Sequence, residues 1–82
     1  MDHDRISRAW LDLKFGPRRS DGGYKLGLTR FNDPVLAFYG GTGEACIWVD
    51  DRPIVNVKFK AELLETVGTL TGNSRKIEPA LV

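Results

Sequence analysis

The segment "IVNVKFKAELLETVGTLTG", residues 54–72, contains the change of pattern that decides the fold. Apolar and polar side chains alternate in its first part, where Val55, Val57 and Phe59 would lie on one face. Alternation of this kind is typical of a strand with one buried face. The segment therefore begins as a predicted strand, whose other face carries basic Lys58 and Lys60.

The second part of the same segment has helical spacing. Leu63, Val67 and Leu70 fall on one face of a helix, with Leu64 beside them. Gly72 suits the end of this helix, because glycine adopts the left-handed conformation that often follows the last turn. We expect an amphipathic helix that follows the strand without a long connection.

The chain upstream of residue 54 has four more runs with strand patterns, separated by Gly, Pro, Asn and Asp turn signals. Short connections between strands favour antiparallel pairing. One of the runs, "VLAFYGG", is apolar on both faces, so we place it in the centre of the sheet, and Gly27 marks an expected bulge. The predicted strands cover residues 10–15, 24–31, 35–41 and 45–50.

These patterns predict an α+β fold, an antiparallel β-sheet meander of four to five strands followed by one C-terminal amphipathic helix. The length of 82 residues predicts one domain, which we place at 9–72. We expect residues 1–8 to be a flexible lead-in and residues 73–82 a flexible tail. Since one helix covers only one face of a sheet, the other face must meet water, a ligand or a second subunit.

Composition favours a soluble, cytoplasmic protein. Cys46 is the one cysteine, so an intramolecular disulfide is excluded. The first residues lack the apolar stretch of a signal peptide, and no apolar run approaches the roughly 20 residues of a membrane span. We therefore expect no contact with a membrane.

The sequence offers no set of residues typical of an enzyme. One histidine, His3, and Cys46 cannot supply the ligands of a zinc site. Asp50 and Asp51 are neighbours where a strand meets a turn; since neighbouring side chains on a strand point to opposite faces, we expect a turn role for this pair and not a catalytic one. We predict a protein without catalytic activity, metal or cofactor.

Basic and aromatic residues are interleaved near the start of the chain. Residues 5–30 carry seven basic and two acidic side chains, while residues 33–51 carry four acids and no base. Cations that follow phosphates, together with aromatic rings on which bases stack, are typical of proteins that bind single-stranded nucleic acid. We predict binding of single-stranded DNA or RNA, with a regulatory role in transcription or replication, through Lys14, Arg18, Arg19, Tyr24, Lys25, Arg30, Phe31, Lys58 and Lys60.

A second interpretation is a small protein-interaction module that regulates or inhibits a larger enzyme complex. Aromatic residues can equally form the core, since aromatic side chains dominate the cores of small domains; this alternative applies to Trp10, Phe38, Trp48 and Phe59. The net charge is only +1, and the acidic segment includes Asp33, Glu44, Asp50 and Asp51. An exposed sheet edge would also allow a partner to add a strand.

Residues 9–71 resemble the positive cofactor four family, single-stranded-DNA-binding transcriptional coactivators related in shape to the Whirly proteins. The resemblance lies in the basic hairpin "YKLGLTRFNDPVLAFY" and in "IVNVKFKAELLETVGTL", a last strand that leads into an amphipathic helix. It implies a homodimer, with DNA held by the curved sheet. By resemblance, phosphate contacts would come from Lys25, Arg30, Lys58 and Lys60, and the dimer interface from Leu63, Leu64, Val67 and Leu70.

Overall fold

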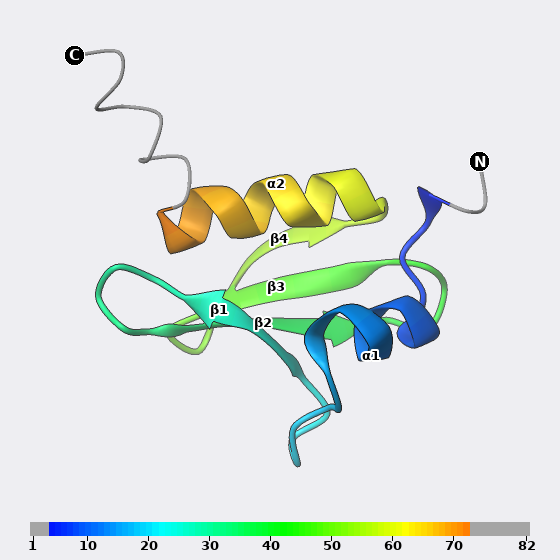
Figure 1. Ribbon diagram of the computed structural model, residues 1–82, viewed down its shortest axis with the longest axis horizontal. Helices are drawn as coiled ribbons and strands as arrows, with labels where there is room; N and C mark the ends of the chain where they lie inside the picture. The colour runs from blue at the N-terminus through cyan, green and yellow to red at the C-terminus, as the bar shows by residue number, and fades with distance from the viewer. Residues whose placement is uncertain (1–3, 73–82) are drawn as a thin grey trace.

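The computed structural model describes residues 4–72 of the chain. Figure 1 shows a sheet with two helices. In chain order the elements are α1 (Arg8–Phe15), β1 (Tyr24–Leu28), β2 (Pro34–Tyr39), β3 (Ala45–Val49), β4 (Arg52–Val57) and α2 (Lys60–Thr71). Neither helix in this part of the chain is long and apolar enough to cross a membrane.

The strands form one antiparallel four-stranded sheet in the order β1-β2-β3-β4. The predicted α+β meander with a C-terminal helix is therefore confirmed, with apolar β2 in the interior of the sheet. The fifth strand, predicted over residues 10–15, is wrong, because this segment is helix α1. Ser7 begins the helix by accepting a hydrogen bond from the Trp10 N–H at 3.1 Å, and Gly16 ends it with a φ of 87°.

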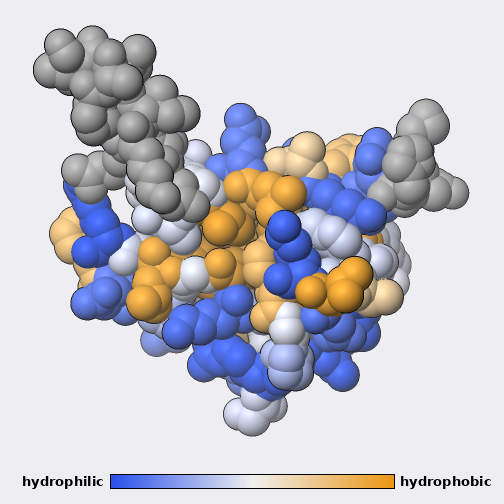
Figure 2. All heavy atoms as spheres, viewed as in Figure 1, coloured by the Kyte–Doolittle hydropathy of each residue, from blue (hydrophilic) through white to orange (hydrophobic). Residues whose placement is uncertain are grey.

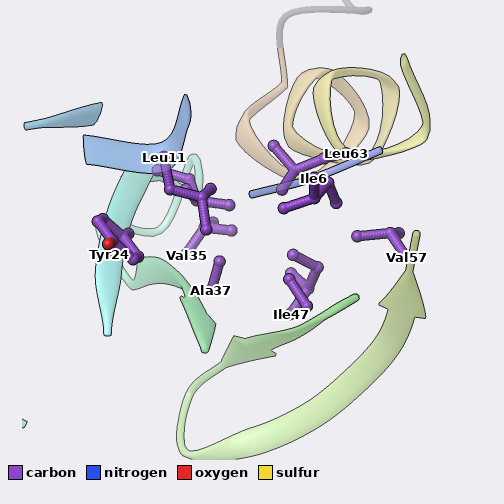
Figure 3. Packing of buried hydrophobic residues seen from close by; sticks show 10 residues of the cluster. Ile6, Leu11, Tyr24, Val35, Ala37, Ile47, Val57 and Leu63 are labelled. Carbon is purple, nitrogen blue, oxygen red and sulfur yellow. The ribbon is translucent and has the colours of Figure 1, made fainter. Parts of the chain in front are cut away.

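Both helices pack on the same face of the sheet. Leu11 of α1 and Leu63 of α2 belong to one buried cluster with side chains from all four strands. Figure 3 shows Leu63 and Ile6 on one side of this cluster, facing Ile47 and Val57 from the sheet. Its members are Ile6, Leu11, Tyr24, Leu26, Val35, Ala37, Ala45, Ile47, Val57 and Leu63.

The helix layer does not cover all of the apolar surface on its side. Figure 2 shows apolar side chains grouped below α2 in the middle of the visible face, with hydrophilic side chains around them. Val67 and Leu70 of α2 are partly buried against the core, whereas Leu64 is 41% exposed. Apolar atoms therefore reach the surface beside α2.

Residues 5 and 6 are part of the fold, so the predicted lead-in over residues 1–8 is wrong in this portion. The Ile6 side chain is buried, and its N–H donates to the Lys58 carbonyl oxygen at 3.0 Å. The Arg5 guanidinium donates to the carbonyl oxygens of Thr42 and Gly43 at 3.1 and 3.3 Å. His3 and the predicted tail, residues 73–82, lie outside the described residues.

Helix α2 confirms the predicted helical spacing and the glycine at its end. The Glu62 carboxylate accepts hydrogen bonds from the N–H groups of Lys58 and Phe59 at 3.0 and 3.1 Å, which satisfies two donors at the helix start. Gly72 follows α2 with a left-handed φ of 83°.

The four residues predicted to line a dimer interface, Leu63, Leu64, Val67 and Leu70, do not form one exposed stripe. Leu63 is fully buried against the chain's own sheet, so its assignment to a dimer interface is wrong. Val67 and Leu70 pack against the same core, and Leu64 alone of the four is well exposed.

A bulge in β1 changes which side chains face the helices. The register with β2 shifts between Lys25 and Gly27, which confirms the bulge expected at Gly27. Because of this shift, Leu28 is exposed and does not share the buried face of Tyr24 and Leu26, as simple alternation predicts. The glycine also allows close packing: a Cβ at Gly27 would lie 2.9 Å from the Thr71 methyl carbon of α2.

Candidate binding surface

The sheet face opposite the helices, here called the outer face, carries apolar side chains. Residues paired across antiparallel strands point to the same face. Leu36 pairs with Trp48 and Phe38 with Cys46, while the alternate residues of β2 and β3 point into the core. All four side chains are partly buried, although no helix among the described residues covers them.

A hollow of about 460 Å³, here called the outer hollow, lies on this face. Its volume is within the range of about 300–1,000 Å³ that is typical of ligand sites. The lining consists of two chemical groups: apolar Pro34, Leu36, Phe38 and Trp48, and acidic Asp21, Asp33, Asp50 and Asp51. The hollow thus combines an apolar, aromatic lining with carboxylates.

Two aromatic rings give the hollow its defined shape. The ring centroids of Phe38 and Trp48 are 5.9 Å apart, and the ring planes meet at 70°. Edge-to-face packing of this kind stabilises the ring positions. Gly23 leaves space for the Phe38 ring, since a Cβ at residue 23 would lie 2.9 Å from its Cζ atom.

Asp50 and Asp51 form the two-residue turn between β3 and β4. Their φ angles are 54° and 61°, and positive values at both central residues are typical of a type I′ hairpin turn. The turn role predicted for this pair is therefore confirmed. Both line the outer hollow.

Asp33 is positioned by the turn between β1 and β2. Its N–H donates to the Thr29 hydroxyl oxygen at 3.1 Å, and its carbonyl oxygen accepts from the Thr29 N–H at 2.8 Å. Asn32 takes a left-handed φ of 69° in this turn. The β1–β2 and β3–β4 turns lie at the same end of the sheet, so Asp33 and the Asp50–Asp51 pair lie at the same end of the hollow.

Nearby cations compensate only part of this negative charge. Asp21 forms an ion pair with Arg19 at 3.4 Å, and Lys25 projects from the outer face beside Leu36. Within residues 4–72, Asp33, Asp50 and Asp51 have no ion-pair partner. In the same part of the chain, no group of three His, Cys, Asp or Glu side chains could hold a metal ion.

Tyr24 cannot take the nucleic-acid contact predicted for it. Its ring is fully buried between α1 and the sheet, and its hydroxyl donates to Asp12 Oδ1 at 2.7 Å. Burial, with the hydrogen bond to Asp12 and the charge of that carboxylate, raises the pKa of Tyr24 above its ordinary value of 10.0. The assignment of Tyr24 as a stacking ring is therefore wrong, and Tyr24 instead joins α1 to β1.

The basic residues predicted to bind nucleic acid lie in several separate places. Lys14 is on α1, and Arg18 and Arg19 line a second hollow in the α1–β1 loop. Strand β4 ends at Val57, so Lys58 and Lys60 do not form a basic strand face. Lys58 lies between β4 and α2, and the Lys60 Nζ lies 5.6 Å from the Trp10 ring centroid.

Two predicted residues do lie together at an accessible turn. Phe31 is 74% exposed, and the Arg30 guanidinium carbon lies 5.2 Å from its ring centroid. Lys25 is the member of the predicted basic set that projects from the outer face. The structure thus brings together Arg30 with Phe31 and Arg18 with Arg19, but it does not place the whole set on one surface.

The apolar lining of the outer hollow is not among the predicted site residues, because the core is the place that the sequence offers for Phe38 and Trp48. The signal that could have found them is their phase. Phe38 alternates with buried Ala37 on β2, and Trp48 alternates with buried Ile47 on β3. A strand that is apolar on both faces, in a sheet with one predicted helix layer, leaves one apolar face without a cover.

Comparison with protein-family models, with curated proteins and with solved structures finds no match to this chain. The resemblance to the positive cofactor four family stays a prediction. Function is therefore inferred from the chain's own side chains, above all those of the outer hollow.

Proposed function

We propose that this protein is a non-catalytic interaction module that binds a protein partner on the outer face of its sheet. One observation carries the proposal: the hollow lined by Leu36, Phe38 and Trp48 lies on the face that neither helix covers. Aromatic side chains in the centre of a surface, with polar groups around them, are typical of the residues that dominate protein binding. A regulator or inhibitor of a larger enzyme complex fits this arrangement.

The composition of the face also bears on the choice between the two functions expected from sequence. Carboxylates at Asp33, Asp50 and Asp51 repel the phosphates of a nucleic acid, so they disfavour its binding on this face. They do not disfavour a polypeptide, whose side chains include cations. The outer hollow therefore supports the protein-interaction function better than the nucleic-acid function.

A random peptide library displayed on phage tests the proposal directly. Peptides selected on the full-length protein are added to ¹⁵N-labelled protein, and amide NMR shifts locate where they bind. We expect shifts at β2 and β3, and loss of binding in the variant Leu36→Thr/Phe38→Thr, which keeps strand-favouring side chains. Circular dichroism checks that the variant is folded. Selected peptides that bind only beside α2, or a library without binders, would contradict the proposal.

Binding of single-stranded nucleic acid remains a second candidate, favoured by the exposed Phe31 ring with Arg30 beside it. Fluorescence anisotropy of a labelled single-stranded oligonucleotide, at low and at moderate salt, tests it. A phosphate binder loses affinity steeply as salt rises. Binding should then fail when Lys25, Arg30, Lys58 and Lys60 are changed to Glu. Absence of binding at low salt would refute this candidate.

A further inference from the structure

The charge of the outer hollow, as well as its shape, restricts the kind of ligand that it can bind. Asp33, Asp50 and Asp51 line it, and none of them has an ion-pair partner within residues 4–72. Carboxylates held near one another repel, and a bound cation relieves that repulsion. The hollow is therefore complementary in charge to a cation.

The apolar part of the lining favours a cation of a particular kind. Aromatic rings attract cations through the negative charge of their faces, and tryptophan does so most strongly. Trp48 and Phe38 provide two rings at 70° to each other inside the same hollow. An ammonium ion is strongly hydrated and resists removal from water, whereas a guanidinium ion is weakly hydrated and stacks on rings.

The size of the site indicates that the cation is part of a larger molecule. A volume of about 460 Å³ exceeds what one guanidinium group fills. The apolar stem of an arginine can pack along Leu36 while its head reaches the carboxylates. Next to the hollow, strand β4 lies at the sheet edge and exposes Ile54, so residues adjoining the arginine would find further contacts.

We propose that the outer hollow binds an arginine side chain carried by a partner polypeptide. Leu36 and the Phe38 and Trp48 rings would pack against the apolar stem and the guanidinium head. Asp33, Asp50 and Asp51 would face the positive charge. This inference rests on the proposed function, since it names the chemistry of the partner. Carboxylate oxygens accept two parallel hydrogen bonds from a guanidinium, which gives the pairing both strength and direction.

Three peptides of the same length test the inference. They are acetyl-Ala-Leu-Xaa-Leu-Ala-amide with Xaa as arginine, lysine or citrulline, and citrulline keeps the shape of arginine without its charge. Each is titrated into full-length ¹⁵N-labelled protein, and binding is followed by the Trp48 indole N–H and the amides of β2 and β3. We expect the arginine peptide to bind about tenfold more tightly than the citrulline peptide, with lysine between them.

The double variant Asp50→Asn/Asp51→Asn supplies the matched change in the protein. Asparagine tolerates the left-handed φ that both turn positions require, so the turn is kept while two charges are lost. We expect this variant to bind the arginine peptide about as weakly as the citrulline peptide. The control Glu65→Gln removes a carboxylate from an exposed position on α2, away from the hollow, and should leave the affinity unchanged.

The outcomes separate this inference from the proposed function. Equal affinity for arginine and citrulline peptides at the outer face would overturn the arginine site and leave the interaction surface standing. Selected peptides that shift no outer-face amide would overturn both. Without peptide, amide shifts at the outer face could grow with protein concentration and vanish in the double variant. That result would overturn the inference and assign the hollow to the Arg18–Arg19 loop of a second copy of this chain. Larger shifts there with a single-stranded oligonucleotide would also overturn the inference.

Discussion

Replacement of two neighbouring leucines in α2 distinguishes a helix that covers its own sheet from one that forms a dimer interface. Leu63 is fully buried in the core of the chain, whereas Leu64 is 41% exposed. The structure therefore predicts very different losses of stability for Leu63→Ala and Leu64→Ala. If α2 instead formed a dimer interface with these residues, the two substitutions would cause similar losses of stability.

The magnitudes follow from the carbon atoms removed. Leu63→Ala deletes three buried carbons, worth about 2.4 kcal/mol at about 0.8 kcal/mol each, and leaves a cavity that raises the total to about 3–4 kcal/mol. Since Leu64 is already 41% exposed, its replacement loses at most about 1.4 kcal/mol and leaves no cavity. A domain of 82 residues has a free energy of unfolding of about 4–12 kcal/mol, so the first loss is a large share of the whole.

Urea unfolding, followed by tryptophan fluorescence and far-UV circular dichroism, measures both losses. Each protein is unfolded at two concentrations about a hundredfold apart, because the stability of a dimer rises with concentration. An unchanged slope with urea shows that the same surface unfolds in each variant. We expect a loss at Leu63 two- to threefold larger than at Leu64. Equal losses, with midpoints that rise with concentration, would refute the packing of α2 on its own sheet.

Three further predictions concern contacts of the helices with β1 and with the segment before α2. Tyr24→Phe should cost about 1 kcal/mol of unfolding free energy, because it removes the hydrogen bond to the exposed Asp12 carboxylate. Since folding raises the pKa of Tyr24, the stability that this hydroxyl contributes is complete below pH 10.0 and is lost as pH rises through the raised value. Urea unfolding at alkaline pH should therefore show the unfolding free energies of the two proteins converging. Gly27→Ala should lower the free energy of unfolding by about 1–3 kcal/mol in thermal unfolding, because its Cβ contacts the Thr71 methyl carbon. Thr71→Ser in the same chain should restore part of the loss, whereas additive losses from the two substitutions would show that the residues do not interact. Hydrogen bonds from Lys58 and Phe59 lower the pKa of the Glu62 carboxyl. In an acid-unfolding series, the extra stability of the wild type over Glu62→Gln should therefore be complete above pH 4.5 and disappear as pH falls through the lowered value. Extra stability that persists at lower pH would contradict this prediction.

The sequence by itself determined the elements whose local signals agree with one another. Leu63, Val67 and Leu70 repeat with helical spacing, and Gly72 takes the left-handed conformation that ends α2. Gly41 and Gly43 take positive φ in the β2–β3 turn, and Gly27 marks the bulge in β1. Each of these signals acts over a few residues, so neighbouring residues suffice to specify it.

Residues 8–15 show where local signals conflict. Leu11, Leu13 and Phe15 alternate as a strand does, and this pattern led to the wrong prediction of a fifth strand. The segment is helical because Ser7 caps its start and Leu11 reaches the core, while Leu13 remains exposed. In so short a segment, the Ser7 cap and the packing of Leu11 against the sheet together decide between the two periods.

The candidate site depends on tertiary structure more than the fold does. Asp21, Asp33 and the Asp50–Asp51 pair come from three separate loops, and strand register brings them to one hollow with Phe38 and Trp48. Register also decided that Tyr24 points into the core, where its ring cannot meet a ligand. The sequence determined which residues are acidic, aromatic or basic. Strand pairing, and the side of the sheet that both helices cover, decided which of these residues share a surface. Both depend on contacts between residues far apart along the chain, which local sequence patterns do not specify.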